Sequence, residues 1–406
     1  MKVGIIGAGA AGVFAAIQVK SNFPKANVEI LEKSNKCLAK VKISGGGRCN
    51  VTTGISEIKI LANSYPRGKN QMKKILHQFN STDTQKWFKQ RGVPLKTEKD
   101  LRVFPKSNDS QSIIDCLLGE LKKHQTSIIY QYPIDEIELK KSRFILKSKR
   151  NGNSRTYEYL IIATGGSPKK SGYLWLEKIG LKIVPPVPSL FTFNVPKSNI
   201  KKLMGISMPK AIVKIIGSKL NSQGPLLITH WGFSGPAVLK LSAFAARELN
   251  EKQYDFKILI NWIGLTDQGE VKNHILSKQK TDGKKRIGHI KLFEIPSRLW
   301  TYLISKSGLS DDSLFGELGL KSINKIINTL CNDEYHVHGK TTFKEEFVTA
   351  GGIDLSTVHI NSLESKVHPK LFFCGEVLNF DGITGGFNFQ VAWSTAYIAG
   401  KLNMTK

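Results

Sequence analysis

The sequence predicts an α/β protein in which both ends of the chain form one Rossmann-type nucleotide-binding domain around an inserted, strand-rich segment. Three observations carry this prediction. An apolar segment at the N-terminus runs into a glycine-rich turn at residues 7–12. The apolar segment Leu371–Cys374, near the C-terminus, has the character of a buried strand. Between them, the pattern becomes strand-rich after a proline cluster at 185–188.

The first elements are expected in the order strand, helix, strand. Val3–Gly7 is a short apolar run that fits a buried strand, and a helix is expected to follow over about 10–19. Asn27–Leu31 fits a second strand, which ends at Glu32. A βαβ beginning of this kind is typical of a parallel sheet with helices on its faces.

The middle of the chain contains one more expected helix and a small meander. Helical periodicity covers 110–123, and short alternating runs then lead to the buried strand Tyr159–Ala163. The prolines of Val184–Pro188 predict a stiff hinge. Residues 292–330 have a helical pattern, and a last helix is expected around 390–402.

These patterns predict three parts. A nucleotide-binding domain is expected from 1–188 together with 340–406. A β-rich, barrel-like domain is expected at 189–265, and a small helical subdomain at 266–339. A chain of 406 residues is long enough for two or three domains.

The charge balance is unusual. Sixty lysines and arginines stand against 32 aspartates and glutamates, which gives a net charge of +28. Such an excess attracts RNA, DNA or an acidic membrane surface. The alternative is compositional drift in a lysine-rich chain, although drift of that kind should raise glutamate as well. Because the excess occurs both in 61–150 and in 191–340, we expect a folded surface to carry it.

The cysteines argue against cross-links and metal. Their number is odd, they are scattered, and no CxxC occurs among Cys37, Cys49, Cys116, Cys331 and Cys374. We therefore expect no disulfide framework, no structural zinc site and a reducing, cytoplasmic location. The sequence has no apolar span of 18 residues and no basic amphipathic helix with a clean apolar face. We therefore expect no membrane partner.

The glycine-rich turn has the spacing of a dinucleotide-binding motif. Gly7 permits a tight turn, Gly9 lets the backbone approach a pyrophosphate, and Gly12 allows the helix to pack closely on the strand. Free N–H groups at the start of the helix then bind phosphate. Glu32, twenty residues after Gly12, is placed to accept hydrogen bonds from ribose hydroxyls. The alternative is a glycine-rich core turn.

Later glycine clusters favour FAD over NAD. Thr164-Gly165 follows a strand in the middle of the chain, and Gly375-Glu376 follows another near its end. Sites at two further strand ends suit a cofactor that extends across the sheet, with adenosine at the first strand and flavin near the last. NAD alone needs no such C-terminal return.

Residues 42–52 form the densest motif. Gly45, Gly46 and Gly47 in succession let the backbone come within hydrogen-bonding distance of a ligand. Arg48 offers a guanidinium fork for phosphate or for negative charge on a reduced flavin. Cys49 and Asn50 add polar groups nearby.

Taken together, GxGAAG, ISGGGRCNVT, THWGFSGPAV at 229–238, VTAGGIDL at 348–355 and the block at 373–400 resemble the BaiN/YhiN-type (RdsA-like) flavoprotein family. The resemblance spans the whole chain. It implies an FAD domain built from both termini, a β-rich inserted domain and a helical subdomain. Thr53 and Cys374 depart from the pattern, which is expected to have Asn and Ala there. Neither departure threatens FAD binding.

The resemblance, together with the motifs, places FAD contacts along the chain. The predicted contacts are Gly7, Gly9, Ala10, Ala11, Gly12, Glu32, Lys33, Ser44, Gly45, Gly46, Gly47, Arg48, Asn50, Thr164, Gly165, Gly375, Glu376, Asp381, Gly385, Gly386, Phe387 and Asn388.

The chemistry implied by the resemblance is divided. Some members reduce conjugated steroid enones, and another branch is a dihydrouridine synthase that acts on 23S rRNA. Both reduce a C=C bond conjugated to a carbonyl, and the net charge of +28 favours RNA. NADH or NADPH is expected to visit the flavin transiently, since no second GxGxxG unit marks a nicotinamide domain. Rival hypotheses are a reductase or oxidase of a small enone or amine, and an RNA-binding flavoprotein whose FAD is not catalytic.

Reduction of such a bond requires an acid that protonates the α carbon. Cys49 is the first candidate, and a small residue packed against the cofactor is the alternative. His230 is the second, because histidine ordinarily titrates near neutral pH. Its alternative is a structural histidine. Trp231 and Phe233 are either base-stacking aromatics or core residues.

Six cations are candidates for contact with RNA phosphates. They fall in two clusters of the inserted region, Lys201, Lys202 and Lys210 in the first and Lys284, Lys285 and Arg286 in the second. The alternative is that they only solvate the surface.

Overall fold

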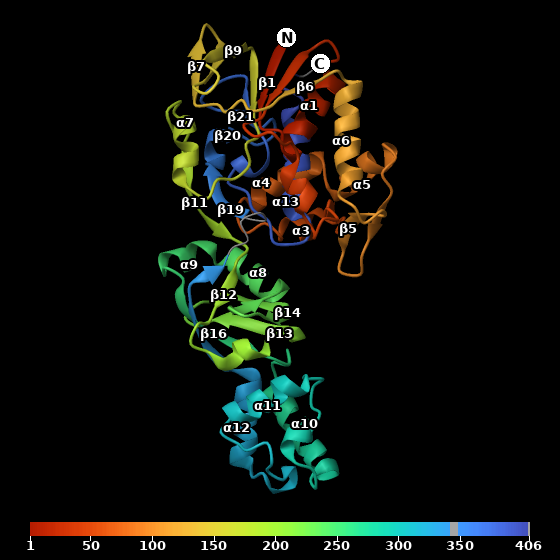
Figure 1. Ribbon diagram of the computed structural model, residues 1–406, viewed down its shortest axis with the longest axis vertical. Helices are drawn as coiled ribbons and strands as arrows, with labels where there is room; N and C mark the ends of the chain where they lie inside the picture. Colours follow the sequence, from red (N-terminus) through yellow and green to blue (C-terminus); the bar gives the residue numbers. More distant parts are fainter. Residues whose placement is uncertain (342–347, 405–406) are drawn as a thin grey trace. The chain divides into compact units, whose positions relative to one another are not determined.

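The computed structural model describes residues 1–341 and 348–404, and the chain divides into two compact units. Unit 1 is Met1–Ser189 with Phe343–Lys406, and unit 2 is Leu190–Thr342. Unit 1 thus contains both chain ends, whereas unit 2 is one continuous segment (Figure 1). Within the described ranges, no helix combines the length and apolar character needed to cross a bilayer.

A seven-stranded sheet lies at the centre of the described part of unit 1, in the order β20-β21-β22-β10-β1-β2-β6. Its five parallel strands are β22 (Leu371–Phe373), β10 (Tyr159–Ile162), β1 (Lys2–Ile6), β2 (Asn27–Leu31) and β6 (Ser127–Ile129). Beside them, β21 (Glu364–Ser365) pairs antiparallel with β22, and the edge strand β20 (Val358–His359) pairs antiparallel with β21. The predicted Rossmann-type α/β fold is therefore confirmed.

Two helices from opposite ends of the chain pack side by side on this sheet. They are α1 (Ala10–Asn22) and α13 (Phe387–Ala399), and α6 (Gln111–Lys123) also contacts α1 (Figure 1). Both α1 and α13 are apolar on nearly all sides because they are covered by the sheet and by other helices. Their side chains belong to one hydrophobic core with the strands.

The segment between β2 and α6 folds into helices and a small sheet that were not among the predicted elements. The elements are α2 (Ala39–Ile43), β3 (Thr52–Thr53), α3 (Ile58–Ala62), α4 (Lys69–Gln78), α5 (Ser81–Gln90), β4 (Leu95–Thr97) and β5 (Arg102–Pro105). Asn80 is the N-cap of α5 and forms a capping box with Asp83. The Asn80 side chain accepts a hydrogen bond from the Asp83 N–H, and the Asp83 carboxylate accepts one from the Asn80 N–H.

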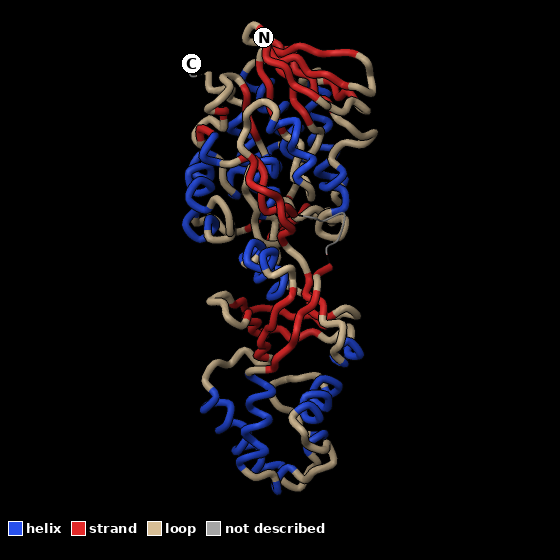
Figure 2. The backbone as a smooth tube through the Cα atoms, turned by 90° about the vertical axis from the view of Figure 1, so that its left-hand side faces the viewer, coloured by secondary structure: helices blue, strands red, loops and turns tan. Residues whose placement is uncertain are grey.

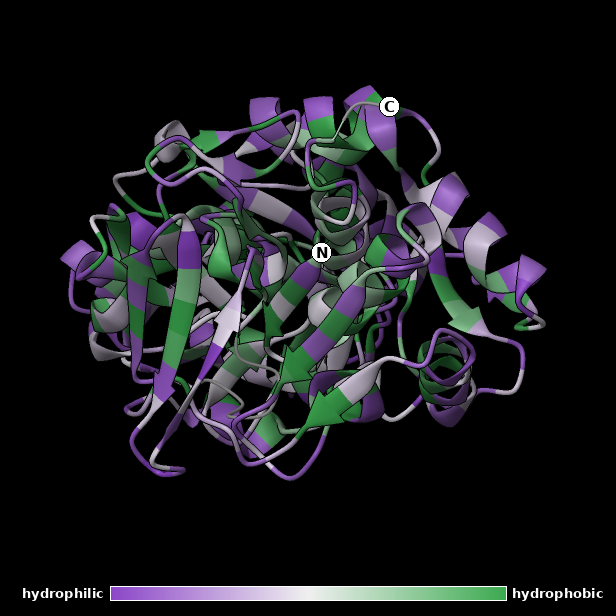
Figure 3. Ribbon diagram, turned by 90° about the horizontal axis from the view of Figure 1, so that it is seen from above, coloured by the Kyte–Doolittle hydropathy of each residue, from purple (hydrophilic) through white to green (hydrophobic). Residues whose placement is uncertain are grey.

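The meander before β10 has three antiparallel strands, β7 (Glu136–Lys140), β8 (Arg143–Ser148) and β9 (Asn153–Tyr157). Along β8 the side chains alternate between buried and more accessible positions. Seen from above, strands of the chain show such alternating hydrophobic and hydrophilic bands (Figure 3). This is the pattern of a sheet with one solvated face.

The expected proline hinge at Val184–Pro188 is a strand instead. These residues lie in β11 (Ile183–Ser189), which pairs antiparallel with β19 (Val348–Ile353) and has an irregular register between Val184 and Val187. The irregularity accommodates prolines, which have no N–H for a regular ladder. Gly351 has φ +136°, and a Cβ there would lie 2.7 Å from Pro185 O, so the backbones meet too closely for a side chain.

Unit 2 contains a second seven-stranded sheet among its described residues, in the order β17-β16-β13-β14-β15-β12-β18. The strands are β12 (Thr192–Asn194), β13 (Ser207–Ile215), β14 (Asn221–Ile228), β15 (Gly232–Ser234), β16 (Asp255–Asn261), β17 (Asp333–His338) and β18 (Lys340–Thr341). The helices are α8 (Pro236–Phe244), α9 (Ala246–Glu251), α10 (Gln268–Asp282), α11 (Ser297–Lys306) and α12 (Leu320–Cys331), and Figure 2 distinguishes strands from helices by colour.

One hydrophobic core joins the sheet and the helices of unit 2. It includes Phe193 and Ile258 from strands and Leu299 and Trp300 from α11. The chain returns to the sheet after α12, because β17 pairs with β16. The separation of a β-rich domain from a helical subdomain, with the expected boundaries, stays a prediction.

Short elements complete the fold. They are α7 (Leu174–Glu177) and the 3-10 turns η1 (Lys170–Tyr173), η2 (Asn199–Leu203), η3 (Ile287–His289), η4 (Phe315–Glu317), η5 (Leu355–Thr357) and η6 (Gly375–Val377).

Candidate functional site

The carboxyl ends of four parallel strands in unit 1 lie in register. Ile6 at the end of β1 aligns with Leu31 of β2 and with Ile162 of β10, and Ile162 aligns in turn with Phe373 of β22. Gly7, Glu32, Thr164 and Gly375 therefore follow at one edge of the sheet. This is the edge at which open α/β sheets bind nucleotides.

Close packing fixes two glycines of the first turn. Gly7 has φ +106°, and a Cβ there would lie 2.5 Å from Ala163 O. A Cβ at Gly12 would lie 1.9 Å from Gly7 O. Both contacts are far shorter than a side chain tolerates, so the turn holds its shape only with glycine at these positions.

Gly9 differs from its neighbours because space around it is open. A Cβ at Gly9 would meet nothing within 4 Å, and its φ of −81° is ordinary. Gly9 precedes α1 and has no side chain that could cap the N–H groups of Ala10 and Ala11. A helix N-terminus beside open space is a site for phosphate.

Glu32 lies next to this turn. Its Oε2 accepts a hydrogen bond from Ala8 N at 2.9 Å, and its Oε1 accepts from Ser34 N at 2.8 Å. Each carboxylate oxygen has a further lone pair, so Glu32 keeps capacity for ribose hydroxyls. Lys33 is exposed beside it.

The loop that follows α2 presents three glycines with positive φ. Gly45, Gly46 and Gly47 have φ of +58°, +68° and +84°, and Cβ atoms at Gly46 and Gly47 would meet nothing within 4 Å. The loop is held in place by Ser110, whose N donates to Gly47 O at 2.8 Å. Ser44 caps α2 internally, since its Oγ donates to Val41 O at 3.0 Å.

Arg48 and Asn50 contact protein groups. The Arg48 guanidinium forms an ion pair with Glu98 at 2.8 Å and lies 3.9 Å from the centre of the Phe104 ring. The side-chain amide nitrogen of Asn50 donates to Val103 O and Thr52 O, and its amide oxygen accepts a hydrogen bond from Gly386 N at 2.9 Å. The two residues thus hold the glycine loop against β5 and against the start of α13.

Cys49 is completely enclosed. Its side chain has no exposed surface, its φ is +57°, and burial raises the pKa of its thiol to about 12. A catalytic acid must reach the substrate, and this thiol has no exposed surface from which to do so. Its burial favours the packing role that the sequence left open.

The C-terminal part of the edge is organised by a threonine and a carboxylate. Gly375 N donates to Thr395 Oγ1 at 2.8 Å. Glu376 Oε1 accepts from Thr349 N at 2.9 Å, and its Oε2 accepts from Lys40 Nζ at 2.9 Å. The carboxylate therefore fixes β19 and α2 beside the strand end.

Asp381 is completely buried and pairs with the Arg67 guanidinium. It also accepts from Ser189 Oγ at 2.7 Å. Because its carboxylate is committed to these two side chains, it fixes the loop before α13 from within. Its burial favours a structural role, and the direct FAD contact of Asp381 stays a prediction.

The loop before α13 is tightly built. Gly385 and Gly386 have φ of +128° and +88°, and a Cβ at Gly386 would lie 2.4 Å from Thr52 O. Asn388 binds both backbone groups of Gly382, at 2.8 Å and 3.0 Å. Phe387 is buried against Tyr65, whose hydroxyl donates to Phe387 O at 3.1 Å.

The edge fits an extended dinucleotide. Cβ atoms would find open space at Gly9, Gly46, Gly47 and Gly165, so backbone N–H groups at these positions can be approached by a ligand. The free helix N-terminus suits phosphates, and the Glu32 carboxylate suits a ribose. Thr164 is exposed at the same edge.

Three residues of this site were missed in the sequence, and two of them had no local signal there. Lys40 and Thr395 act through contacts with residues far along the chain, which no local spacing reveals. Tyr130 directly follows β6, and burial and a hydrogen bond with Cys37 raise its pKa to about 12. Its position after a parallel strand was the one available clue.

In unit 2, His230 and Trp231 form the turn between β14 and β15. His230 is exposed, and its ring centre lies 4.0 Å from that of the half-buried Trp231. Phe233 is completely buried and packs edge-on against Tyr335 at 4.8 Å, so it is a core residue.

The six predicted phosphate ligands differ in their surroundings. Lys201 is half-buried, and its Nζ donates to Pro196 O. Lys285 pairs with Asp282 at 2.6 Å, and Arg286 pairs with Asp312. The remaining three, Lys202, Lys210 and Lys284, are exposed.

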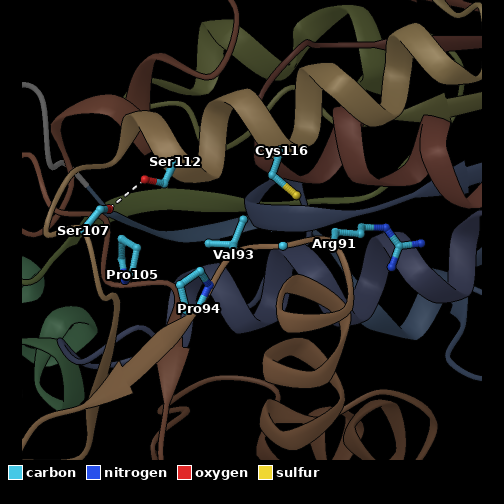
Figure 4. A pocket seen from close by; sticks show the side chains of 8 residues that line it. Arg91, Val93, Pro94, Pro105, Ser107, Ser112 and Cys116 are labelled. Atoms are coloured by element: carbon cyan, nitrogen blue, oxygen red, sulfur yellow. Dashed lines mark hydrogen bonds between the residues drawn. The ribbon is translucent and has the colours of Figure 1, made fainter.

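A hollow of about 290 Å³ also lies in unit 1, and Figure 4 shows its lining. Arg91 at its margin pairs with Glu120 at 2.9 Å and lies 3.9 Å from the Trp87 ring centre. Burial raises the pKa of the Cys116 thiol to about 11. These groups offer no reactive pair, so the hollow is not the candidate site.

Comparisons with known proteins agree with this geometry. The profile of a family described as HI0933-like protein Rossmann domain matches residues 1–402. The ribosomal RNA dihydrouridine synthase of Haemophilus influenzae is 28% identical over 97% of this chain and 96% of its own. The 3-dehydro-bile acid delta(4,6)-reductase of Clostridium scindens is 25% identical over 98% of each chain.

A solved structure shares the fold. The open conformation of a flavocytochrome c3 fumarate reductase aligns with a TM-score of 0.51 and 15% identity, and the alignment covers 99% of this chain and 77% of that one.

Proposed function

This chain belongs to the HI0933-like Rossmann family and is an FAD-dependent oxidoreductase, and from that premise we propose that it reduces uridine in large-subunit ribosomal RNA. NADH or NADPH is the proposed electron donor. The observation that carries the proposal is the alignment of four strand ends beside open glycines, because it gives an extended dinucleotide one continuous backbone cradle.

The choice of substrate is supported by charge. The two curated relatives are about equally similar, and their names describe a modified uridine and a reduced bile acid. Dihydrouridine is uridine whose conjugated C=C bond has gained two hydrogen atoms. A steroid-like acid needs no cationic protein, whereas a net charge of +28 suits a polyanionic substrate.

Separate parts of the edge hold the cofactor in this proposal. The first turn of α1 after Gly9 binds the pyrophosphate, and Glu32 binds the adenosine ribose. The loop at 44–50 and the segment from Gly375 to Asn388 face the flavin half. When bound, FAD supplies the hydride that reduces one carbon of the double bond.

The chain itself supplies the proton for the other carbon. Of the two candidates, the Cys49 thiol is enclosed, while the His230 imidazole is exposed and can be reached by a substrate. We therefore propose His230 as the acid. His230→Asn should slow substrate reduction by about 100-fold and leave reduction of the flavin by NAD(P)H unchanged. Loss of both steps together would remove His230 from this role.

The test of the function is mass analysis of ribosomal RNA from cells with and without this protein. We expect one uridine to carry two additional hydrogen atoms only when the protein is present. Complementation with the His230→Asn chain should restore little of the modified nucleotide. Identical RNA from both strains would reject the proposal.

A reductase of a small enone is the second candidate, because the bile-acid enzyme and the dihydrouridine synthase have similar sequence identity to this chain, 25% and 28%. It predicts full turnover of an enone without RNA and little dependence of the rate on salt. An RNA-binding flavoprotein without catalysis predicts that RNA binds but no uridine changes.

A further inference from the structure

One segment of unit 2 has no negative charge of its own. Residues 190–247 contain seven lysines and one arginine, and neither aspartate nor glutamate occurs among them. Acidic residues elsewhere in the chain commonly pair with neighbouring cations, as Asp282 does with Lys285. The seven lysines of this segment have no acidic neighbour within it, whereas Arg247 at its end is followed by Glu248, so the field of the lysines is not neutralised within the segment.

The fold gathers four of the cations of unit 2 around the His230 turn. Val195 N donates to Trp231 O at 2.9 Å, which places Lys197 close to that turn. Gly205 N donates to Ile228 O at 2.9 Å, so η2, with Lys201 and Lys202, lies between two attachments to the same region.

Arg298 joins this group from a different element. It belongs to α11, and its Nη2 donates to Lys202 O at 2.9 Å. We name Lys197, Lys201, Lys202, Arg298 and His230 together the η2 surface. Met204, 57% exposed, adds an apolar contact point directly after η2.

Lys197, Lys202 and Arg298 of the η2 surface are exposed to a ligand, whereas Lys201 is half-buried and its Nζ donates to Pro196 O. In the part of the chain that the structure describes, none of the lysines of this surface or Arg298 forms an ion pair. Other basic segments are partly neutralised. Lys285 and Arg286 pair with Asp282 and Asp312, and Lys147 of β8 pairs with Glu136 and Glu138.

We propose that the η2 surface binds the phosphate backbone of RNA beside the His230 turn. This inference rests on the proposed function, and it adds the place at which unit 2 holds the RNA. Its cations supply phosphate contacts, which set position without reading sequence. Met204 and the Trp231 edge offer apolar contact to an unpaired base. A bilayer fits less well, because η2 is too short to present an apolar helical face.

The test compares two matched double variants of the FAD-loaded protein. Lys201→Gln with Lys202→Gln removes two charges from the η2 surface, and Lys321→Gln with Lys325→Gln removes two exposed charges from α12 of unit 2. Purified large-subunit ribosomal RNA is the probe, and its Kd is measured over a range of salt concentrations. Flavin content and thermal unfolding are recorded for each protein to show that it is folded.

We expect the first variant to bind RNA at least about tenfold more weakly, with a salt slope lower by about 2. The second variant should stay within about twofold of the unchanged protein. Equal losses in both variants would overturn the inference, because the binding would then depend on overall charge. Tight binding to phosphatidylserine vesicles, lost in the first variant while RNA binding is kept, would assign the surface to a membrane and overturn it as well.

The two proposals fail in different ways. If the unchanged protein modifies uridine and the η2 variant binds RNA normally, the docking surface is wrong and the function stands. If the unchanged protein neither binds RNA nor modifies uridine, the function fails and the docking surface fails with it.

Discussion

The glycine-rich edge of unit 1 and the η2 surface of unit 2 are built on opposite principles. At the edge, atoms are so close that a Cβ at Gly12 would lie 1.9 Å from Gly7 O. At the η2 surface, Lys202 and Arg298 are exposed, and only their summed charge matters. A compact cofactor is therefore held by the shape of the backbone, in which one atom can be decisive. A polyanion is held by a sum of contacts, in which each single contact contributes little.

The largest effect is expected when a buried ion pair of unit 1 is broken. Asp381→Ala removes the carboxylate that Arg67 contacts in the interior of unit 1, where Asp381 has no exposed surface. We expect the free energy of unfolding to fall by about 3–5 kcal/mol, measured by urea denaturation. Flavin bound per folded chain should fall less than in a variant at Gly9, since Asp381 acts on the loop from within.

Asp312→Ala is the matched control, because its pair with Arg286 is exposed in unit 2. It should change stability by no more than about 0.5 kcal/mol. Similar losses in both variants would break the contrast between the two units.

The next test fills the open space at Gly9. Gly9→Leu places a side chain where the phosphates are proposed to bind, and nothing in the protein obstructs it. Flavin affinity should fall at least about 100-fold, or about 2.7 kcal/mol, while the unfolding temperature of the flavin-free protein is kept. Visible absorbance of the purified protein measures the flavin.

Gly319→Leu is its control in unit 2. Gly319 also precedes a helix, α12, and a Cβ there would likewise meet nothing within 4 Å. It should keep full flavin content. Retention of flavin by Gly9→Leu would contradict the pyrophosphate position.

A smaller effect is expected at Cys49. Cys49→Ala removes one buried sulfur atom, and we expect a loss of about 1 kcal/mol of stability. Uridine reduction should remain within about twofold of the unchanged enzyme, whereas His230→Asn should slow it strongly. A selective loss of substrate reduction in Cys49→Ala would restore the thiol as the acid.

The smallest effect concerns pH. Burial tends to raise the pKa of Glu120, but hydrogen bonds from Lys123 at 2.6 Å and Arg91 at 2.9 Å outweigh it, and the pKa is lowered. This stabilisation is therefore complete above the ordinary pKa of about 4.3 and is lost as pH falls through the folded value.

Glu120→Gln should cost about 1 kcal/mol at neutral pH and nothing in acid, as measured by urea denaturation at both pH values. Glu334→Gln breaks an exposed pair with Lys257 in unit 2 and should cost less. A constant cost for Glu120→Gln across the pH range would show that its charge is not involved.

The sequence was informative wherever chain direction and backbone conformation are set locally. Apolar runs that stop at glycine, at Gly7 and again at Gly375, predicted strand ends that the structure aligns. The helices α4 and α5 were missed although their buried residues have helical spacing, as Met72, Ile75 and Leu76 do in α4, because both helices are short and rich in polar residues. The strand β11 was missed because its prolines indicate a hinge unless the partner strand is known.

The contacts between side chains could not be predicted from the sequence, for a different reason. Arg67 and Asp381 are 314 residues apart, so no spacing could predict that the carboxylate is committed to a guanidinium. The enclosure of Cys49 has the same origin, since its neighbours come from distant segments. Exposed lysines lie at the opposite extreme, because packing places almost no constraint on them.

The arrangement of β22 beside β10 has a consequence for biosynthesis. The ribosome produces β1, β2 and β10 early, but Leu371–Phe373 and α13 are made only after the whole of unit 2. Unit 2 can fold as soon as it has emerged, whereas the N-terminal strands must wait for the final segment before their sheet is complete. A chain released prematurely near residue 370 would thus carry a finished inserted unit and an unfinished cofactor cradle.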